Sequence, residues 1–439
     1  MTAAAQIALA LGSVVVLLGL MMVIRRVAVV WNIGAELQRK LVHIGTGIYA
    51  IVLPWLFPDR WPVYVLVVVT LLVMLVLRLP NSRLGRTLHG VDRQSYGDLL
   101  LAVSVGLCLF LSEGRLFLYV LPIAVLTLAD ATAALVGRSY GTRFFRVEEG
   151  DKSIEGSTVF FAVTLLISVI CLMLMTPFPP LNIIVLSVMV AAFGTLVEAV
   201  SWRGFDNLFL PMGLLIFLSV HAEDPLLDLL ALAVLFAGCI VAFKFISPKI
   251  GLTNHAARVY VTAVFLLLAV TELQNALFPI LVLAAHVWSR SVAPSNSKFP
   301  DLDIVAGLAM VSFGSLTLGN ATGWNAVSFY GIVAMGMMIG HCALALGSWS
   351  SSARYIGIAG IFAAALGMRA IVVGLNPDGA NWNGPMWFVV VASAVLMAIV
   401  PSAFPALFTR ARVTKLTLLA LSIPLASYLY AIDIPGLWA

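Results

Sequence analysis

The sequence predicts an all-α, polytopic integral membrane protein. Of its 439 residues, 62% are hydrophobic and only 10% are charged, whereas a soluble domain carries about 25% charged residues. The apolar residues occur in runs that are mostly about 16 to 24 residues long, which is the length an α-helix needs to cross a bilayer. Helices are expected because a chain in lipid must satisfy its backbone hydrogen bonds internally.

Sixteen apolar stretches qualify as candidate spans, so we expect about 14 to 16 transmembrane helices. They cover residues 5–24, 41–57, 62–79, 97–111, 116–136, 158–176, 181–200, 207–220, 226–248, 256–271, 273–289, 303–319, 326–347, 353–375, 385–409 and 413–432. The first is longer than the apolar core of a typical signal peptide, so we expect it to be retained. Stretches 97–111 and 207–220 are short enough to be tilted or re-entrant.

The distribution of Lys and Arg predicts the orientation of these helices. If the N-terminus lies outside, nearly all of the 25 Lys and Arg residues fall in or beside cytoplasmic linkers, as the positive-inside rule requires. The polar motifs described below then face the cytoplasm. In a prokaryote, the expected location is the plasma membrane.

The densest polar stretch begins at Asp130, a carboxylate inside an apolar segment, where a charge is costly and usually functional. Asp130, Ala134 and Gly137 share one helical face, and the helix is expected to break at Gly137. A carboxylate there could hold Mg²⁺ bridging two phosphates. The alternative is a face of small packing residues, with the aspartate satisfied by a neighbouring arginine.

A basic, glycine-containing loop follows this helix and leads into the next apolar stretch. Glycines, cations and backbone N–H groups at a helix start are what a phosphate requires, so we expect a nucleotide-phosphate site. The residues predicted for it are Gly137, Arg138, Gly141, Lys152, Ser153, Gly156 and Ser157. An ordinary positive-inside loop would explain the arginines equally well. The sequence contains no Walker GxxxxGK[ST] pattern that would indicate a P-loop fold.

Two further polar groups lie at the predicted cytoplasmic level. Glu198 lies near the end of one apolar stretch, and Asp206 with Asn207 opens the next, so both groups could belong to the site. Alternatively, Glu198 is a surface carboxylate, and Asp206 with Asn207 forms a helix N-cap. Lys40 and His43 begin the second span and could bind a phosphate or move a proton. They could instead be a membrane-surface anchor and a structural histidine.

Together these motifs resemble the polyprenol kinase family, which includes dolichol kinases, phytol kinases and CTP-dependent diacylglycerol kinases. The resemblance covers roughly residues 36–215 and consists of RKLVH, LADATAALVGRSYG, KSIEGS and E-(7)-DNL-(2)-P, in this order. It implies transfer of a phosphoryl group from CTP, or another nucleotide, to the hydroxyl of a membrane lipid alcohol. The loop departs from the family pattern because it is longer and carries Glu148, Glu149 and Asp151, which would repel a nucleotide unless paired or metal-bound.

The resemblance gives each motif an expected role. Residues 1–250 would form the kinase-like domain, and residues 251–439 an additional membrane domain of unknown role, in which Glu272, His341, Arg369 and Asp378 are scattered. The expected catalytic residues are Asp130, Lys152, Glu198 and His43, and Asp206 and Asn207 would join the nucleotide site. Asp130, Glu198 and Asp206 would hold Mg²⁺.

The expected partners are a nucleoside triphosphate, a lipid alcohol from the bilayer and membrane lipids, with no nucleic acid. Two alternatives stay open. One is a cytidylyltransferase-like lipid enzyme, although the C-terminal acidic signature of the phosphatidate cytidylyltransferases is not found. The other is a transporter or flippase, which would place its carboxylates nearer the bilayer midplane.

Overall fold

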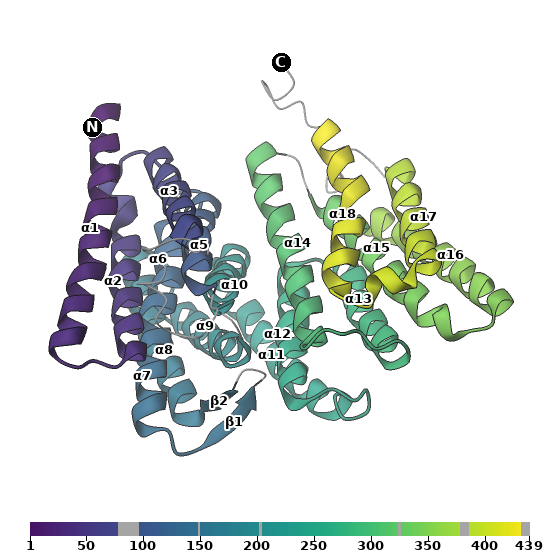
Figure 1. Ribbon diagram of the computed structural model, residues 1–439, viewed down its shortest axis with the longest axis horizontal. Coiled ribbons are helices and arrows are strands. Elements are labelled where there is room, and N and C mark those ends of the chain that lie inside the picture. The colour runs from purple at the N-terminus through teal and green to yellow at the C-terminus, as the bar shows by residue number, and fades with distance from the viewer. Residues whose placement is uncertain (78–95, 148–149, 202–203, 324–325, 378–385, 432–439) are drawn as a thin grey trace. The chain divides into compact units, whose positions relative to one another are not determined.

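Each apolar stretch predicted to span the membrane forms a helix in the computed structural model (Figure 1). The structure describes residues 1–77, 96–147, 150–201, 204–323, 326–377 and 386–431. Glu148, Glu149 and Asp378, named above, lie outside these ranges. The chain divides into two compact units, Met1–Gly238 and Cys239–Ala439. The roles expected for residues 1–250 and 251–439 stay predictions.

The first unit is a helical bundle with one small β-hairpin. Its elements are α1 (Ala3–Val30), α2 (Ala35–Leu56), α3 (Trp61–Leu77), α5 (Gly97–Leu111), α6 (Leu116–Ala124), the π-helical turn η1 (Val125–Ala129), α7 (Asp130–Tyr140), β1 (Phe144–Val147), β2 (Gly150–Ser153), α8 (Ile154–Met175), α9 (Pro180–Val200) and α10 (Asp206–His221). Helix α11 (Leu226–Ile246) contains the boundary between the units.

In the second unit, the described secondary structure consists of helices and short 3₁₀ turns, without strands. Its elements are α12 (Asn254–Val270), α13 (Leu273–Val292), α14 (Pro300–Thr322), α15 (Val327–Ala345), the 3₁₀ turn η2 (Leu346–Ser348), α16 (Ser351–Leu375), α17 (Trp387–Ala403), the 3₁₀ turn η3 (Pro405–Phe408) and α18 (Arg412–Ala431). The stretch Ser328–Ser348, which includes most of α15, is buried along its candidate span and forms the centre of this unit.

The described chain contains nine helices that are long and apolar enough to cross a membrane, and five shorter apolar ones. Their outer faces are apolar: Leu166, Ile170 and Leu174 of α8 are all exposed. The same helix turns Thr164 and Ser168 inward. Apolar side chains outside and small polar ones inside are typical of helices that face lipid. The protein is therefore an all-α polytopic membrane protein, while its orientation stays a prediction.

The loop between α7 and α8 differs from the expectation. Helix α7 continues past Gly137 to Tyr140, and α8 begins at Ile154, before the predicted start at residue 158. Between them, β1 and β2 form an antiparallel hairpin in which Phe145 pairs with Lys152. The hairpin carries Lys152 toward the interior of the unit. The position of Lys152 is therefore fixed by the backbone pairing of the two strands.

Helices α7 and α8 approach closely because glycines face each other across their contact. A Cβ atom on Gly156 would lie 2.9 Å from the Ala133 carbonyl oxygen and 3.2 Å from the Gly137 Cα. Both of these neighbours are backbone atoms and cannot move aside as a flexible side chain could. Small residues at such a contact let two backbones come together in a membrane. The contact holds the start of α8 against α7.

We expect Gly156→Ala to destabilise the folded protein by about 1–3 kcal/mol through overpacking. Thermal unfolding of the detergent-solubilised protein measures the effect. The matched control is Gly12→Ala in α1, where a Cβ atom would meet nothing within 4 Å. Equal melting temperatures for the two variants would show that the contact between α7 and α8 is not as tight as the structure indicates.

Candidate active site

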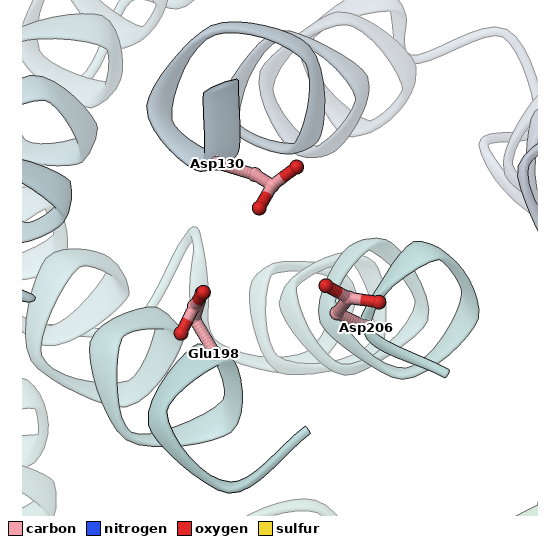
Figure 2. Close-up of side chains that lie close together, drawn as sticks. All are labelled: Asp130, Glu198 and Asp206. Carbon is pink, nitrogen blue, oxygen red and sulfur yellow. The ribbon is translucent and has the colours of Figure 1, made fainter. Parts of the chain in front are cut away.

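Three carboxylates from separate helices converge in the first unit. Asp130 opens α7, Glu198 lies in the last turn of α9 and Asp206 opens α10. Carboxylate oxygens of the three residues lie within 4.8 Å of one another, and Figure 2 shows them around a shared space. Asp130 lies far from Glu198 and Asp206 in sequence, so the fold brings them together. They are the residues from which the sequence predicts a magnesium site.

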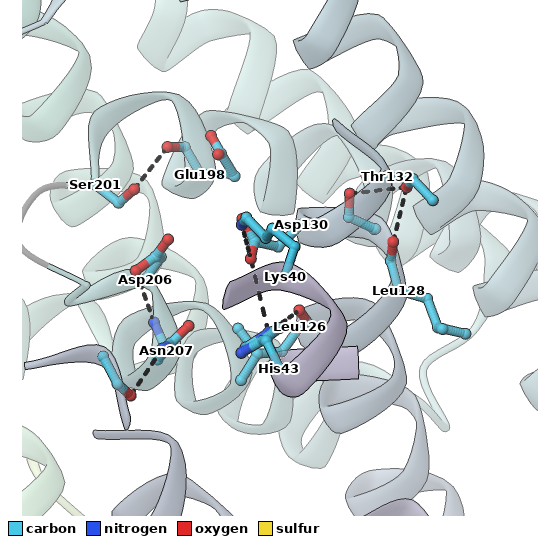
Figure 3. Close-up of polar contacts among 12 residues, drawn as sticks. Lys40, His43, Leu126, Leu128, Asp130, Thr132, Glu198, Ser201, Asp206 and Asn207 are labelled. Carbon is cyan, nitrogen blue, oxygen red and sulfur yellow. Dashed lines mark hydrogen bonds and ion pairs between the residues drawn. The ribbon is translucent and has the colours of Figure 1, made fainter. Parts of the chain in front are cut away.

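Asp130 is neutralised by a lysine from α2. Lys40 Nζ donates a hydrogen bond of 2.7 Å to Asp130 Oδ2, and the two side chains are only 5% and 7% exposed. His43 lies one turn further along α2, with Nε2 3.7 Å from the same oxygen (Figure 3). Breaking a buried ion pair leaves an uncompensated charge and is strongly destabilising. Lys40 therefore fixes both the position and the charge of Asp130.

A π-helical turn immediately precedes Asp130. Such turns widen the helix and often occur at functional sites. The carbonyl of Leu126, within this turn, lies 3.2 Å from His43 Nε2, so the ring donates to it in the tautomer that carries its proton on Nε2. The turn thereby orients His43 beside Asp130. Sequence reasoning missed the π-helical turn, because VLTLA is an ordinary apolar stretch without a local signal.

Lys152 pairs with the second carboxylate. Its Nζ donates to Glu198 Oε2 at 2.6 Å, to the Glu198 carbonyl oxygen, and to Ser201 Oγ at 3.2 Å. The lysine side chain remains 24% exposed. Because the carbonyl groups at a helix C-terminus attract cations, the end of α9 is a favourable place for Lys152. The residue can also reach a ligand, since it is not fully buried.

The third carboxylate is positioned by Asn207. Asn207 Nδ2 donates to the Gly97 carbonyl at 2.8 Å, and Ser104 Oγ donates to the Asn207 carbonyl at 2.6 Å. These bonds tie the first turn of α10 to α5. The suggestion that Asp206 and Asn207 cap this helix is wrong, because Phe205 occupies the N-cap position and Asp206 is the first helical residue. Asp206 is held in place through its neighbour.

The polar groups at the end of α7 and the start of α8 form local hydrogen bonds. Ser153 is the N-cap, and its Oγ accepts from the Gly156 N–H at 3.0 Å. Ser157 Oγ donates to the Ser153 carbonyl at 3.2 Å, and the Gly141 N–H donates to the Gly137 carbonyl at 3.1 Å. These groups, predicted to meet phosphate, instead bond to one another in this structure. A phosphate-binding role for them stays a prediction.

A cavity of about 330 Å³ reaches Lys40 from the side of α2 and α7. Apolar side chains of Leu37, Ala134 and Leu135 line it, together with Arg138 and Ser139. Arg138 is exposed. The cavity is therefore open to Lys40, the partner of Asp130, and Arg138 forms part of its lining.

The donor set suits a hard divalent cation. All three close groups are carboxylates, and oxygen is the ligand atom that Mg²⁺ prefers. With all three carboxylates ionised and His43 neutral, the two lysines leave one net negative charge. One divalent cation would make the site positive, which is what an incoming triphosphate requires. Among the described residues no other group of three His, Cys, Asp or Glu side chains comes this close together.

Fold and site together define a polytopic membrane protein with a lysine-paired carboxylate centre formed by α7, α9 and α10. The chain is 33% identical over 182 residues to a phytol kinase from Synechocystis sp., an alignment that covers 41% of this chain and 76% of the relative. The protein therefore belongs to the polyprenol/phytol kinase-like family. No protein-family model matches the chain. No solved structure matches it either.

Proposed function

We propose that this protein is an integral membrane kinase that transfers the terminal phosphoryl group of a nucleoside triphosphate to the hydroxyl of a lipid alcohol. The proposed donor is CTP, and the proposed acceptor is an isoprenoid alcohol such as phytol or a polyprenol. The observation that carries the proposal is the convergence of Asp130, Glu198 and Asp206 beside two lysines. The similarity of this chain to a phytol kinase supports a lipid alcohol as the acceptor.

Asp130, Glu198 and Asp206 would hold Mg²⁺, and the bound ion would neutralise phosphate charge. Lys40 keeps Asp130 ionised and oriented through the bond of 2.7 Å. This pre-organisation matters because catalysis of phosphoryl transfer is almost entirely positioning and electrostatic stabilisation. The carboxylates would otherwise repel one another and spread apart.

Lys152 is the cation best placed to act on the transferred group. It is partly exposed and is held at the carboxylate centre by Glu198. When a triphosphate arrives, Lys152 can exchange one of its three donated hydrogen bonds for a phosphate oxygen. Arg138, at the edge of the cavity, would meet a more distant phosphate. Ser153, Gly156 and Ser157 would support Lys152 by fixing the junction between β2 and α8.

Deprotonation of the acceptor alcohol requires a base close to the carboxylates. His43 and Asp130 are the candidates, because His43 Nε2 lies 3.7 Å from Asp130 Oδ2 and both side chains are anchored by buried contacts. The alcohol would approach from the bilayer, with its apolar chain among the helices and its hydroxyl at this level. The cavity beside Lys40 offers one such approach.

A transfer assay tests the proposal. Purified protein in detergent with Mg²⁺ is offered γ-labelled CTP or ATP and one of phytol, a polyprenol or a diacylglycerol. We expect label in the organic phase with an isoprenoid alcohol, and more from CTP than from ATP. Transfer only to diacylglycerol would disprove the proposed acceptor, and transfer only from ATP would disprove the proposed donor.

A further inference from the structure

A second group of buried ionisable side chains lies in the second unit, away from the residues assigned above. Tyr260 of α12, His286 and Arg290 of α13, and Asp301 of α14 meet around one carboxylate. Arg290 Nη1 donates to Asp301 Oδ2 at 2.7 Å, and Tyr260 OH donates to Oδ1 at 3.3 Å. His286 Nε2 lies 3.4 Å from Oδ1. Arg290 therefore already neutralises Asp301, and His286 is not needed as its counter-ion.

A second histidine extends this group into the centre of the unit. His341 of α15 bonds through Nδ1 to Ser289 Oγ at 3.0 Å, and its ring centroid lies 5.2 Å from that of His286. His286 is 1% exposed and His341 is fully buried. The rings meet edge to face, so the two imidazoles are direct neighbours in the interior of the unit.

Both histidines keep nitrogen atoms that make no hydrogen bond within the described chain. These are both ring nitrogens of His286 and Nε2 of His341. An unsatisfied buried polar group costs about 1–3 kcal/mol, and apolar side chains of similar size would pack here without that cost. Ionisable side chains in the interior of a membrane bundle mark ion or proton pathways more often than packing.

The exposure of the group falls steadily from its edge to its centre. The Arg290 side chain is 25% exposed and that of Asp301 is 10% exposed, whereas the His286 side chain is 2% exposed. Arg290 and Asp301 therefore form the solvent-facing side of the group, and the two imidazoles lie further inside. A preformed metal site is not indicated, because the two histidines and Asp301 are not among the described groups of three ligand residues that come close together.

We propose that His286 and His341 form an intramembrane proton-binding site in the second unit, connected to water through Asp301. The ligand is one proton taken from bulk water: an N–H bond forms on an imidazole as an O–H bond of hydronium breaks, and no electron is transferred. The Asp301 carboxylate stabilises the imidazolium that results. Imidazole is suited to this exchange because it gains and loses its proton near neutral pH.

Within the described residues, three further helices packed against α15 are relevant to the charge around the pair: α16, α17 and α18. Arg412 of α18 donates to the Phe408 carbonyl and to the Pro294 carbonyl, just beyond the end of α13. Helix α17 has no ionisable side chain. Arg369 of α16 lies against Gly331, about 15 Å along α15 from His341 at 1.5 Å per residue. Among the described contacts, Asp301 is the anion beside the pair, with Oδ1 3.4 Å from His286 Nε2.

Nuclear magnetic resonance of the full-length protein, labelled with ¹⁵N-histidine and placed in lipid nanodiscs, tests the site. His286→Asn and His341→Asn assign the two rings. We expect at least one ring to convert from neutral imidazole to imidazolium between about pH 8 and about pH 4. Asp301→Asn should lower the midpoint of this titration by about one pH unit, because the neighbouring negative charge is lost. The Asp301→Asn variant should still fold: Arg290 loses its ionic partner, but its side chain is partly exposed and can turn toward water.

His221→Gln in the first unit is the matched control, and it should leave both signals unchanged. Two rings that stay neutral across this pH range, or a midpoint that Asp301→Asn does not move, would overturn the proposal. Zn²⁺ binding that requires both histidines would also overturn it, in favour of a metal site. The result is independent of kinase activity, so it separates this inference from the proposed function.

Discussion

Asp130→Asn is expected to reduce phosphoryl transfer by at least about 10²–10³-fold, the range typical for loss of one preorganised electrostatic group. The amide keeps the shape of the side chain but removes the negative charge that would hold Mg²⁺. Initial rates of label transfer to phytol, measured at saturating nucleotide and Mg²⁺, give the effect. Because the proposed role of Asp130 is to position the phosphates through Mg²⁺, kcat should fall more than the apparent affinity for the alcohol.

A loss of folding must be separated from a loss of chemistry in this variant. Removing the charge of Asp130 leaves the buried ammonium of Lys40 unpaired, which typically costs about 3–5 kcal/mol. The double variant Asp130→Asn with Lys40→Met removes both charges and should recover thermal stability while remaining inactive. If the double variant is as stable as the parent and also fully active, Asp130 is not part of the catalytic centre.

Lys152→Met is expected to lower the rate by about 10²-fold or more, because the cation proposed to meet the transferred phosphoryl group is lost. Its partner Glu198 is only partly buried, with a side chain 16% exposed, so the unpaired carboxylate can reach water and the protein should still fold. The same transfer assay, with thermal unfolding alongside, measures both properties.

Arg143→Ala on the same hairpin is the matched control for Lys152. Its side chain is exposed, and the Arg143 backbone N–H that meets Glu155 is unaffected by the substitution. We expect near-normal transfer from this variant. Equal losses in Lys152→Met and Arg143→Ala would indicate that the hairpin contributes only general positive charge, and Lys152 would lose its assigned role.

The helices could be predicted from the sequence because lipid imposes a simple rule on them. A segment that crosses the bilayer must be apolar over about 20 residues and satisfy its own hydrogen bonds, and both requirements are visible in composition alone. The short stretches 97–111 and 207–220 form the helices α5 and α10. The hairpin around Lys152 could not be predicted because neither FFRV nor GDKS alternates apolar and polar residues, and the pairing of the two strands depends on their junctions with α7 and α8.

The candidate site was predictable as a set of residue types but not as an arrangement. Asp130, Glu198 and Asp206 stand out because carboxylates are rare in apolar sequence. Their pairing with Lys40 and Lys152 depends on how α2, α9 and the hairpin pack, which no local pattern encodes. For the same reason, the sequence predicts for Lys40 only a membrane-surface anchor or a phosphate ligand. In the structure, Lys40 forms an ion pair with Asp130.

The central claim is that the terminal phosphate of a nucleotide is transferred to a lipid alcohol at the Asp130–Glu198–Asp206 centre. The most direct test mixes purified protein, phytol and Mg²⁺ with CTP in two separate reactions. In one reaction the CTP is labelled on the α-phosphate, and in the other it is labelled on the γ-phosphate. The account predicts lipid-bound label from the γ-labelled sample alone, abolished by Asp206→Asn. Label from the α-phosphate would indicate a cytidylyltransferase-like enzyme. Absence of label from both samples, with folded protein, would contradict a kinase and favour a transporter.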